Sequence, residues 1–116
     1  MENLMQNSTG RNDYVAVDAL ERLLANRGAV TLLDARSPEE YSRGHVPGAL
    51  NVPIADLPDF ARNRLTPSTA PVVTMCGSSG RGEQAAGILA AAGVENVQVL
   101  QGGLKAWREA GFAVDD

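Results

Sequence analysis

The chain has 116 residues and a formal net charge of −4, from 10 basic and 14 acidic side chains. This length suits one domain with its own hydrophobic core, and the mild acidity excludes nucleic acid and an anionic membrane as expected partners. No apolar run approaches the ~18 residues of a membrane helix, and the first residues do not resemble a signal peptide, so we expect a cytoplasmic location. One cysteine excludes an intramolecular disulfide, and with one histidine it excludes a self-contained zinc site, so we expect no metal and no cofactor.

The polar segment at the start of the chain shows no hydrophobic periodicity. We therefore predict a flexible lead-in over residues 1–13 and a single domain over residues 14–116. A short apolar stretch from Tyr14 to Val17 enters a helix with a leucine stripe on one face, and Gly28 is suited to end that helix. The leucines of the stripe are Leu20, Leu23 and Leu24.

The next part of the chain has the pattern of a buried strand followed by a short helix. Residues 29–33 form a nearly continuous apolar run, which is typical of a strand buried on both faces. Ser37 is positioned to cap a helix, Pro38 suits its first position, and Glu40 completes a capping box. Because Gly44 follows so soon, we expect this helix to end within about two turns.

From the turn at residues 45–48 onward, strands and helices continue to alternate through short connections. This order predicts an α/β domain with a mainly parallel sheet, in which ligands bind beyond the carboxyl ends of the strands. Cys76 and Asp34 both follow such strand ends. The expected strands span residues 49–52, 71–75 and 97–100, and the expected helices span residues 54–62, 82–92 and a short stretch from Gly103 to Gly111.

Cys76 stands where the strand over residues 71–75 gives way to a loop rich in glycine and serine. The helix that follows would direct its positive end and its unpaired backbone N–H groups at this loop, and Arg81 adds a positive charge. These groups favour the anionic form of a thiol, so Cys76 is a candidate nucleophile. The alternative is a buried, inert cysteine, although such residues usually lie within apolar runs.

Asp34 and Arg36 leave a predicted strand near the expected position of this loop, which makes them candidate substrate-binding residues. In the alternative interpretation Asp34 fixes neighbouring backbone, while Arg36 pairs with it or with a helix carboxylate. The sequence leaves both interpretations open. His45 is the only histidine and therefore a candidate general base.

Three separated motifs follow one another along the chain. The first comprises Asp34-Ala35-Arg36, Glu40-Tyr41 and Gly44-His45-Val46-Pro47-Gly48-Ala49 with Asn51 and Pro53; the second is the six-residue loop from Cys76 to Arg81; the third comprises Gly102-Gly103, Trp107 and Gly111. These motifs, in this order, resemble those of the single-domain rhodaneses, a family of sulfurtransferases. The resemblance extends from Leu32 to Val114, which is most of the chain.

The resemblance implies a three-layer α/β fold, in which helices flank both faces of a mainly parallel central sheet. It implies that Cys76 takes a sulfane sulfur from a small donor such as thiosulfate, forms a persulfide, and passes the sulfur to cyanide or to a thiol, including a protein thiol. In this family the glycine–histidine turn at His45 is structural, which favours that role over catalysis. The substrate-binding loop residues implied by the resemblance are Gly77, Ser78, Ser79, Gly80 and Arg81. Two positions depart from the usual family pattern. Ser79 stands where the family usually has a glycine, and Gly82 stands where it usually has a small polar residue.

Two rival functions remain open. Cysteine-dependent phosphatases and arsenate reductases have a related fold, but they place five residues between cysteine and arginine to enclose a tetrahedral anion. Four residues separate Cys76 from Arg81, so loop length favours sulfur transfer. The second rival is a non-catalytic rhodanese-like regulatory module, although such modules often lack the cysteine that is present here.

Overall fold

The computed structural model describes residues 13–26, 29–65, 71–77 and 80–116. Within these residues a five-stranded sheet has the order β1-β5-β4-β2-β3, and every neighbouring pair of strands is parallel. The strands are β1 (Asp13–Val15), β2 (Thr31–Asp34), β3 (Leu50–Asn51), β4 (Val72–Met75) and β5 (Val97–Leu100). The helices are α2 (Val17–Ala25), α3 (Pro38–Ser42), the 3-10 helix η1 (Ile54–Asp56), α4 (Leu57–Arg64), α5 (Gly80–Ala91) and α6 (Gly103–Glu109).

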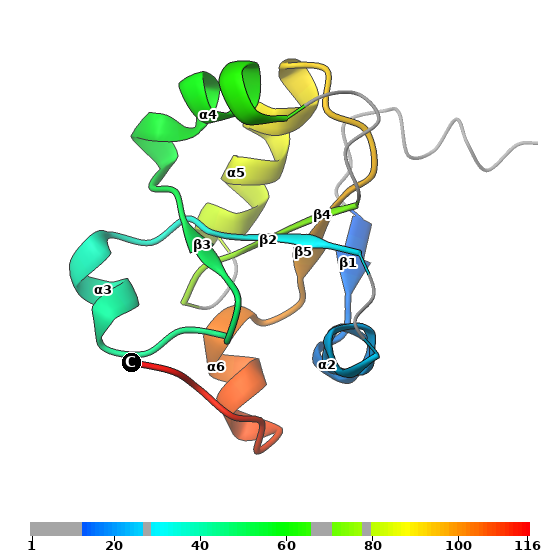
Figure 1. Cartoon of the computed structure of the whole chain (residues 1–116), viewed down its shortest axis with the longest axis vertical. Helices are drawn as coiled ribbons and strands as arrows, with labels where there is room; N and C mark the ends of the chain where they lie inside the picture. The colour runs from blue at the N-terminus through cyan, green and yellow to red at the C-terminus, as the bar shows by residue number, and fades with distance from the viewer. Residues whose placement is uncertain (1–12, 27–28, 66–70, 78–79) are drawn as a thin grey trace, which may run out of the picture.

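Helices cover both faces of the sheet, with α4 and α5 on one side and α2 and α6 on the other (Figure 1). Successive side chains of a strand point to opposite faces, so Leu32 and Leu33 of β2 enter two different cores. Leu32 belongs to the same core as Leu20 of α2 and Trp107 of α6, whereas Leu33 belongs to the same core as Leu57 of α4. This three-layer arrangement confirms the predicted α/β fold class.

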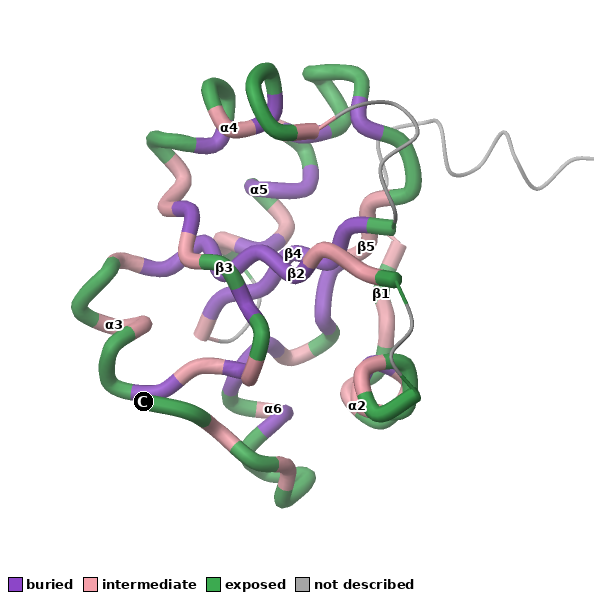
Figure 2. Tube along the Cα trace, viewed as in Figure 1, coloured by how far each residue is buried: buried purple, intermediate pink, exposed green. Residues whose placement is uncertain are grey.

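Strand β4 lies at the centre of the sheet, and all four of its residues are buried (Figure 2). A strand covered on both faces needs a continuous apolar run, which residues 72–75 supply except at Thr74. The Thr74 hydroxyl donates a hydrogen bond to the backbone oxygen of Gly82 at 2.7 Å, so this buried polar group is satisfied. Gly82 also lies so close to β4 that an added Cβ would be 3.3 Å from the Cα of Met75. The start of α5 is therefore held directly against the end of β4.

Most of the predicted elements are present, with boundaries displaced by a few residues. The strand predicted over residues 97–100 is β5, and the predicted capping box at Ser37 and Glu40 has both of its hydrogen bonds. The helix predicted over residues 54–62 is divided into η1 and α4, with Pro58 in the first turn of α4. In the described part of the chain, no helix is long and apolar enough to span a membrane.

The first apolar stretch enters the predicted helix, which is α2, but it also contains a strand that the sequence did not predict. Asp13, Tyr14 and Val15 form β1, an edge strand that pairs with β5. Asp13 had been assigned to the lead-in, and the remainder of that segment, residues 1–12, lies outside the described residues. Three residues are too few to show the alternation that identifies a strand in a sequence, and here the pairing partner supplies the extended structure.

Gly102 provides a test of the turn that begins α6. Its φ is +78°, which residues with a side chain rarely adopt, and an added Cβ would lie 2.5 Å from the Cβ of Ala106. We therefore expect Gly102→Ala to lower the free energy of unfolding by about 1–3 kcal/mol. Gly87→Ala is the matched control, because Gly87 lies in α5 with nothing within 4 Å of an added Cβ. That change should stabilise the protein by about 1 kcal/mol. Urea denaturation measures both, and equal midpoints for the two variants would contradict this account.

Candidate active site

Cys76 directly follows β4, at the carboxyl end of the central strand, and is only 2% exposed. Its backbone oxygen accepts a hydrogen bond from the N–H of Leu104, and the backbone oxygen of Gly77 accepts one from the N–H of Lys105, both at 2.9 Å. Both donors belong to the first turn of α6, where backbone N–H groups have no partner within the helix. The start of α6 thus holds the backbone of Cys76 and of the residue that follows it.

The loop after Cys76 leads into α5, whose first two residues are Gly80 and Arg81. The positive end of this helix therefore faces the loop, as the sequence predicted. Ser78 and Ser79 were predicted to bind substrate, and they lie outside the described residues. Of the predicted loop residues, the structure places Gly77, Gly80 and Arg81 around the carboxyl end of β4.

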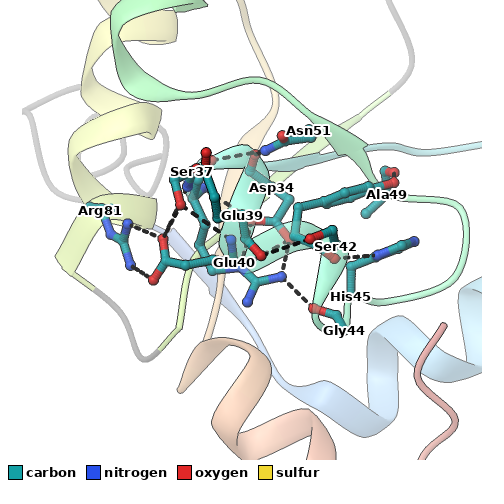
Figure 3. Close-up of polar contacts among 12 residues, drawn as sticks. Asp34, Ser37, Glu39, Glu40, Ser42, Gly44, His45, Ala49, Asn51 and Arg81 are labelled. Atoms are coloured by element: carbon teal, nitrogen blue, oxygen red, sulfur yellow. Dashed lines mark hydrogen bonds and ion pairs between the residues drawn. The ribbon is translucent and has the colours of Figure 1, made fainter. Parts of the chain in front are cut away.

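Arg81 reaches from the first turn of α5 to Glu40 of α3 and forms a two-pronged ion pair with it (Figure 3). Its Nη1 donates to Oε1 at 2.7 Å, and its Nη2 donates to Oε2 at 3.0 Å. Hydrogen bonds from Arg81 are the main reason that the pKa of Glu40 falls from 4.5 to about 2. The same bonds raise the pKa of Arg81, and the negative charge of a Cys76 thiolate adds to this rise. The guanidinium is therefore within electrostatic reach of the thiol.

Glu40 also forms a capping box with Ser37 at the start of α3. Its Oε1 accepts a hydrogen bond from the backbone N–H of Ser37 at 3.0 Å, while the Ser37 hydroxyl oxygen accepts one from the backbone N–H of Glu40 at 3.2 Å. The sequence predicted this capping box but not the ion pair, because Arg81 lies 41 positions after Glu40 and only the fold brings them together. One carboxylate thus joins the start of α3 to the start of α5.

Asp34 and Arg36 form a buried ion pair at the carboxyl end of β2, with exposures of 0% and 6%. The guanidinium of Arg36 donates to both carboxylate oxygens of Asp34, and its Nη2 also donates to the backbone oxygen of Gly44 at 2.6 Å. The side-chain amide of Asn51 donates to the backbone oxygens of both residues. These contacts tie β2 to the turn after α3, and they match the structural alternative for the pair rather than substrate binding.

His45 is held in place by its own turn. Its Nδ1 lies 2.8 Å from the backbone oxygen of Tyr41, and the two rings are stacked with their centroids 3.7 Å apart. Its backbone N–H and oxygen pair with those of Asp115 in an antiparallel bridge. These contacts support a structural role. Among the described residues, no cluster of three or more His, Cys, Asp or Glu side chains could hold a metal ion.

The family model for the rhodanese-like domain matches residues 16–110 of this chain. The chain belongs to the rhodanese-like family. This match covers the complete loop from Cys76 to Arg81 and confirms the resemblance inferred from the separated motifs. The solution structure of a rhodanese-like domain from an Anabaena protein agrees with it, with a TM-score of 0.83, 32% sequence identity, and coverage of 90% of this chain and 80% of that one.

Curated relatives of this rhodanese-like chain include a named sulfurtransferase. The thiosulfate sulfurtransferase GlpE of Pseudomonas entomophila is 36% identical over 90 residues, which cover 76% of this chain and 80% of that protein. An uncharacterized protein of Synechocystis is 36% identical over 114 residues, which cover 93% of this chain. The chain spans about half the length of two curated relatives that it matches, 59% of the Synechocystis protein and 45% of the other.

The ion pair between Glu40 and Arg81 predicts how stability changes with pH. The pKa of Glu40 is lower in the folded chain than the ordinary 4.5, so its ionised form stabilises the fold fully above pH 4.5, and this contribution is lost as the pH falls toward 2. Glu40→Gln keeps an acceptor for the capping box but removes the charge. Because the pair is partly exposed, we expect this variant to be about 0.5–1 kcal/mol less stable at pH 7, with a difference from wild type that shrinks as the pH falls toward the folded pKa of about 2.

Urea denaturation at several pH values between 7 and 2 measures this convergence. Glu39→Gln is the control, because the Glu39 side chain makes no hydrogen bond or ion pair in the described part of the chain, although it lies in the same helix. A stability difference between wild type and Glu40→Gln that stays constant over this pH range would contradict the ion pair's contribution.

Proposed function

We propose that this chain is a rhodanese-type sulfurtransferase that moves a sulfane sulfur from a small donor, such as thiosulfate, to a thiophilic acceptor through a persulfide on Cys76. The observation that carries this proposal is the position of Cys76, at the end of the central strand and the start of a six-residue loop, in a member of the rhodanese-like family. The sulfurtransferases among its relatives support the same chemistry.

In the first half-reaction the Cys76 thiolate attacks the outer sulfur of thiosulfate. A bond forms between this sulfur and Sγ, the bond between the two thiosulfate sulfurs breaks, and sulfite leaves with the electron pair. The transferred sulfur now carries the negative charge of a persulfide. The positive end of α5 favours an anion at this position, before and after the transfer.

In the second half-reaction the acceptor removes the outer sulfur of the persulfide. Cyanide or a thiolate attacks that sulfur, the S–S bond breaks, and the electron pair returns to Sγ of Cys76 as thiolate. With cyanide the product is thiocyanate, and with a thiol, including a protein thiol, the product is a new persulfide. No other cysteine exists in the chain to release the sulfur, so the acceptor must come from outside it.

The first test of this proposal is the removal of the thiol. Cys76→Ser should abolish thiocyanate formation from thiosulfate and cyanide, because a hydroxyl cannot form a persulfide and the chain has no second cysteine. Circular dichroism should show an unchanged fold, since serine is close to cysteine in size. Thiocyanate formation above a tenth of the wild-type rate would overturn the mechanism.

The length of the loop generates a second test. Four residues separate Cys76 from Arg81, so convergent N–H groups can surround a single terminal sulfur but leave little room for a phosphoryl group with three equatorial oxygens. We expect turnover of thiosulfate without turnover of aryl phosphates. Inserting one glycine between Gly80 and Arg81 should weaken sulfur transfer, because the N–H groups would no longer converge on one atom.

Colorimetric assays of thiocyanate and of released phenol, made on the same preparations, measure both activities. Cys76→Ser protein serves as the background control for each assay. Cys76-dependent hydrolysis of an aryl phosphate by the wild-type protein, at a rate above that of sulfur transfer, would assign the chain to phosphate chemistry instead.

A further inference from the structure

Three described basic residues near the carboxyl ends of β2 and β4 each have a carboxylate partner. Arg81, the only basic residue of the loop, is paired with Glu40 through both prongs of its guanidinium. Arg36 is paired with Asp34, which is buried. The backbone N–H of Lys105 donates to the backbone oxygen of Gly77. The Lys105 ammonium group lies 2.7 Å from a carboxylate oxygen of Glu109. The charges around the thiol are therefore compensated by the protein itself.

This compensation matters because thiosulfate and the sulfite that leaves it both carry two negative charges. A guanidinium binds a sulfonate group in the same two-pronged way that it binds a carboxylate. In this structure the carboxylate of Glu40 already makes such a two-pronged contact with Arg81 (Figure 3). A sulfonate can take these two N–H groups only by displacing Glu40, and at the remaining N–H groups it meets a guanidinium whose charge Glu40 already offsets. A donor of low charge does not need the contact at all.

We infer that Glu40 is a specificity-determining residue that occupies the anion-binding fork of Arg81 and thereby selects thiol persulfides over thiosulfate as sulfur donors. This inference rests on the proposed sulfurtransferase function and deepens it by naming the class of donor. With a persulfide RSSH, the Cys76 thiolate attacks the terminal sulfur and the S–S bond of the donor breaks. The thiolate RS⁻ leaves with the electron pair, and the proton stays on the transferred sulfur.

A purely structural role for Glu40 makes the opposite prediction. If the ion pair served only to hold the start of α5 beside the start of α3, removing it would loosen the loop and slow transfer from every donor. If Glu40 competes with the donor, removing its charge speeds transfer from thiosulfate alone. The sign of the change therefore distinguishes the two roles.

The experiment compares two donors on wild-type protein and on Glu40→Gln, which keeps an acceptor for the capping box. The donors are thiosulfate and 2-hydroxyethyl persulfide, whose tail is uncharged. Quenched samples analysed by intact mass give the rate constant for sulfur loading of Cys76 at low donor concentration. For an exposed ion pair we expect loading from thiosulfate to become about two- to fivefold faster in Glu40→Gln, and loading from the persulfide to change less than that.

Three controls make the result specific. Glu39→Gln removes the same charge from the same helix without touching Arg81 and should leave the ratio of the two rate constants unchanged. In an Arg81→Ala background, Glu40→Gln should give no gain with thiosulfate, because the fork is gone. The gain should also shrink at high ionic strength, since it comes from attraction between exposed charges.

The possible outcomes separate this inference from the function on which it rests. If wild-type Cys76 loads sulfur but Glu40→Gln is unchanged or slower with thiosulfate, the donor preference is overturned and the sulfurtransferase function stands. An equal gain with both donors, or a gain that persists in the Arg81→Ala background, also overturns it. If Cys76 takes up sulfur from neither donor, the proposed function fails, and the donor preference fails with it.

Discussion

The candidate active site depends on how the chain leaves the buried strand β4. The backbone oxygens of Cys76 and Gly77 follow a strand end in the interior, where an unpaired carbonyl would be costly. The first turn of α6 has N–H groups that lack helical partners, and those of Leu104 and Lys105 satisfy both oxygens. The same two hydrogen bonds therefore satisfy both the carbonyl groups after the strand and the N–H groups at the start of the helix. The left-handed conformation of Gly102 allows α6 to begin where these contacts form.

The electrostatics of the site follow from this framework. The start of α5 directs its positive end at the loop after Cys76, so the mechanism that we propose draws on fixed dipoles that need no side chain. The side-chain charge of Arg81, in contrast, is shared with Glu40 and partly neutralised by it. A site stabilised mainly by backbone groups suits a reaction in which a single negative charge moves between sulfur atoms. The donor preference that we infer follows from this arrangement, because a doubly charged donor would benefit from an unpaired cation.

The sequence predicted those features that depend on local patterns. The alternating order of elements, strand β5, the capping box at Ser37 and the end of strand β4 just before Cys76 all have short-range signals, and all are present in the structure. The features that it missed depend on partners distant in the chain. Strand β1 is extended because β5 pairs with it, and Glu40 reaches Arg81 only because the fold brings α3 and α5 together. A single sequence contains no signal for either contact.

The central claim is that Cys76 carries the transferred sulfur. The most direct test is the intact mass of the protein after exposure to excess thiosulfate or 2-hydroxyethyl persulfide without an acceptor, and again after addition of cyanide. This account predicts a gain of one sulfur atom that cyanide or a thiol reductant removes, and no gain in Cys76→Ser protein. An unchanged mass with both donors, or an equal gain in Cys76→Ser, would contradict it.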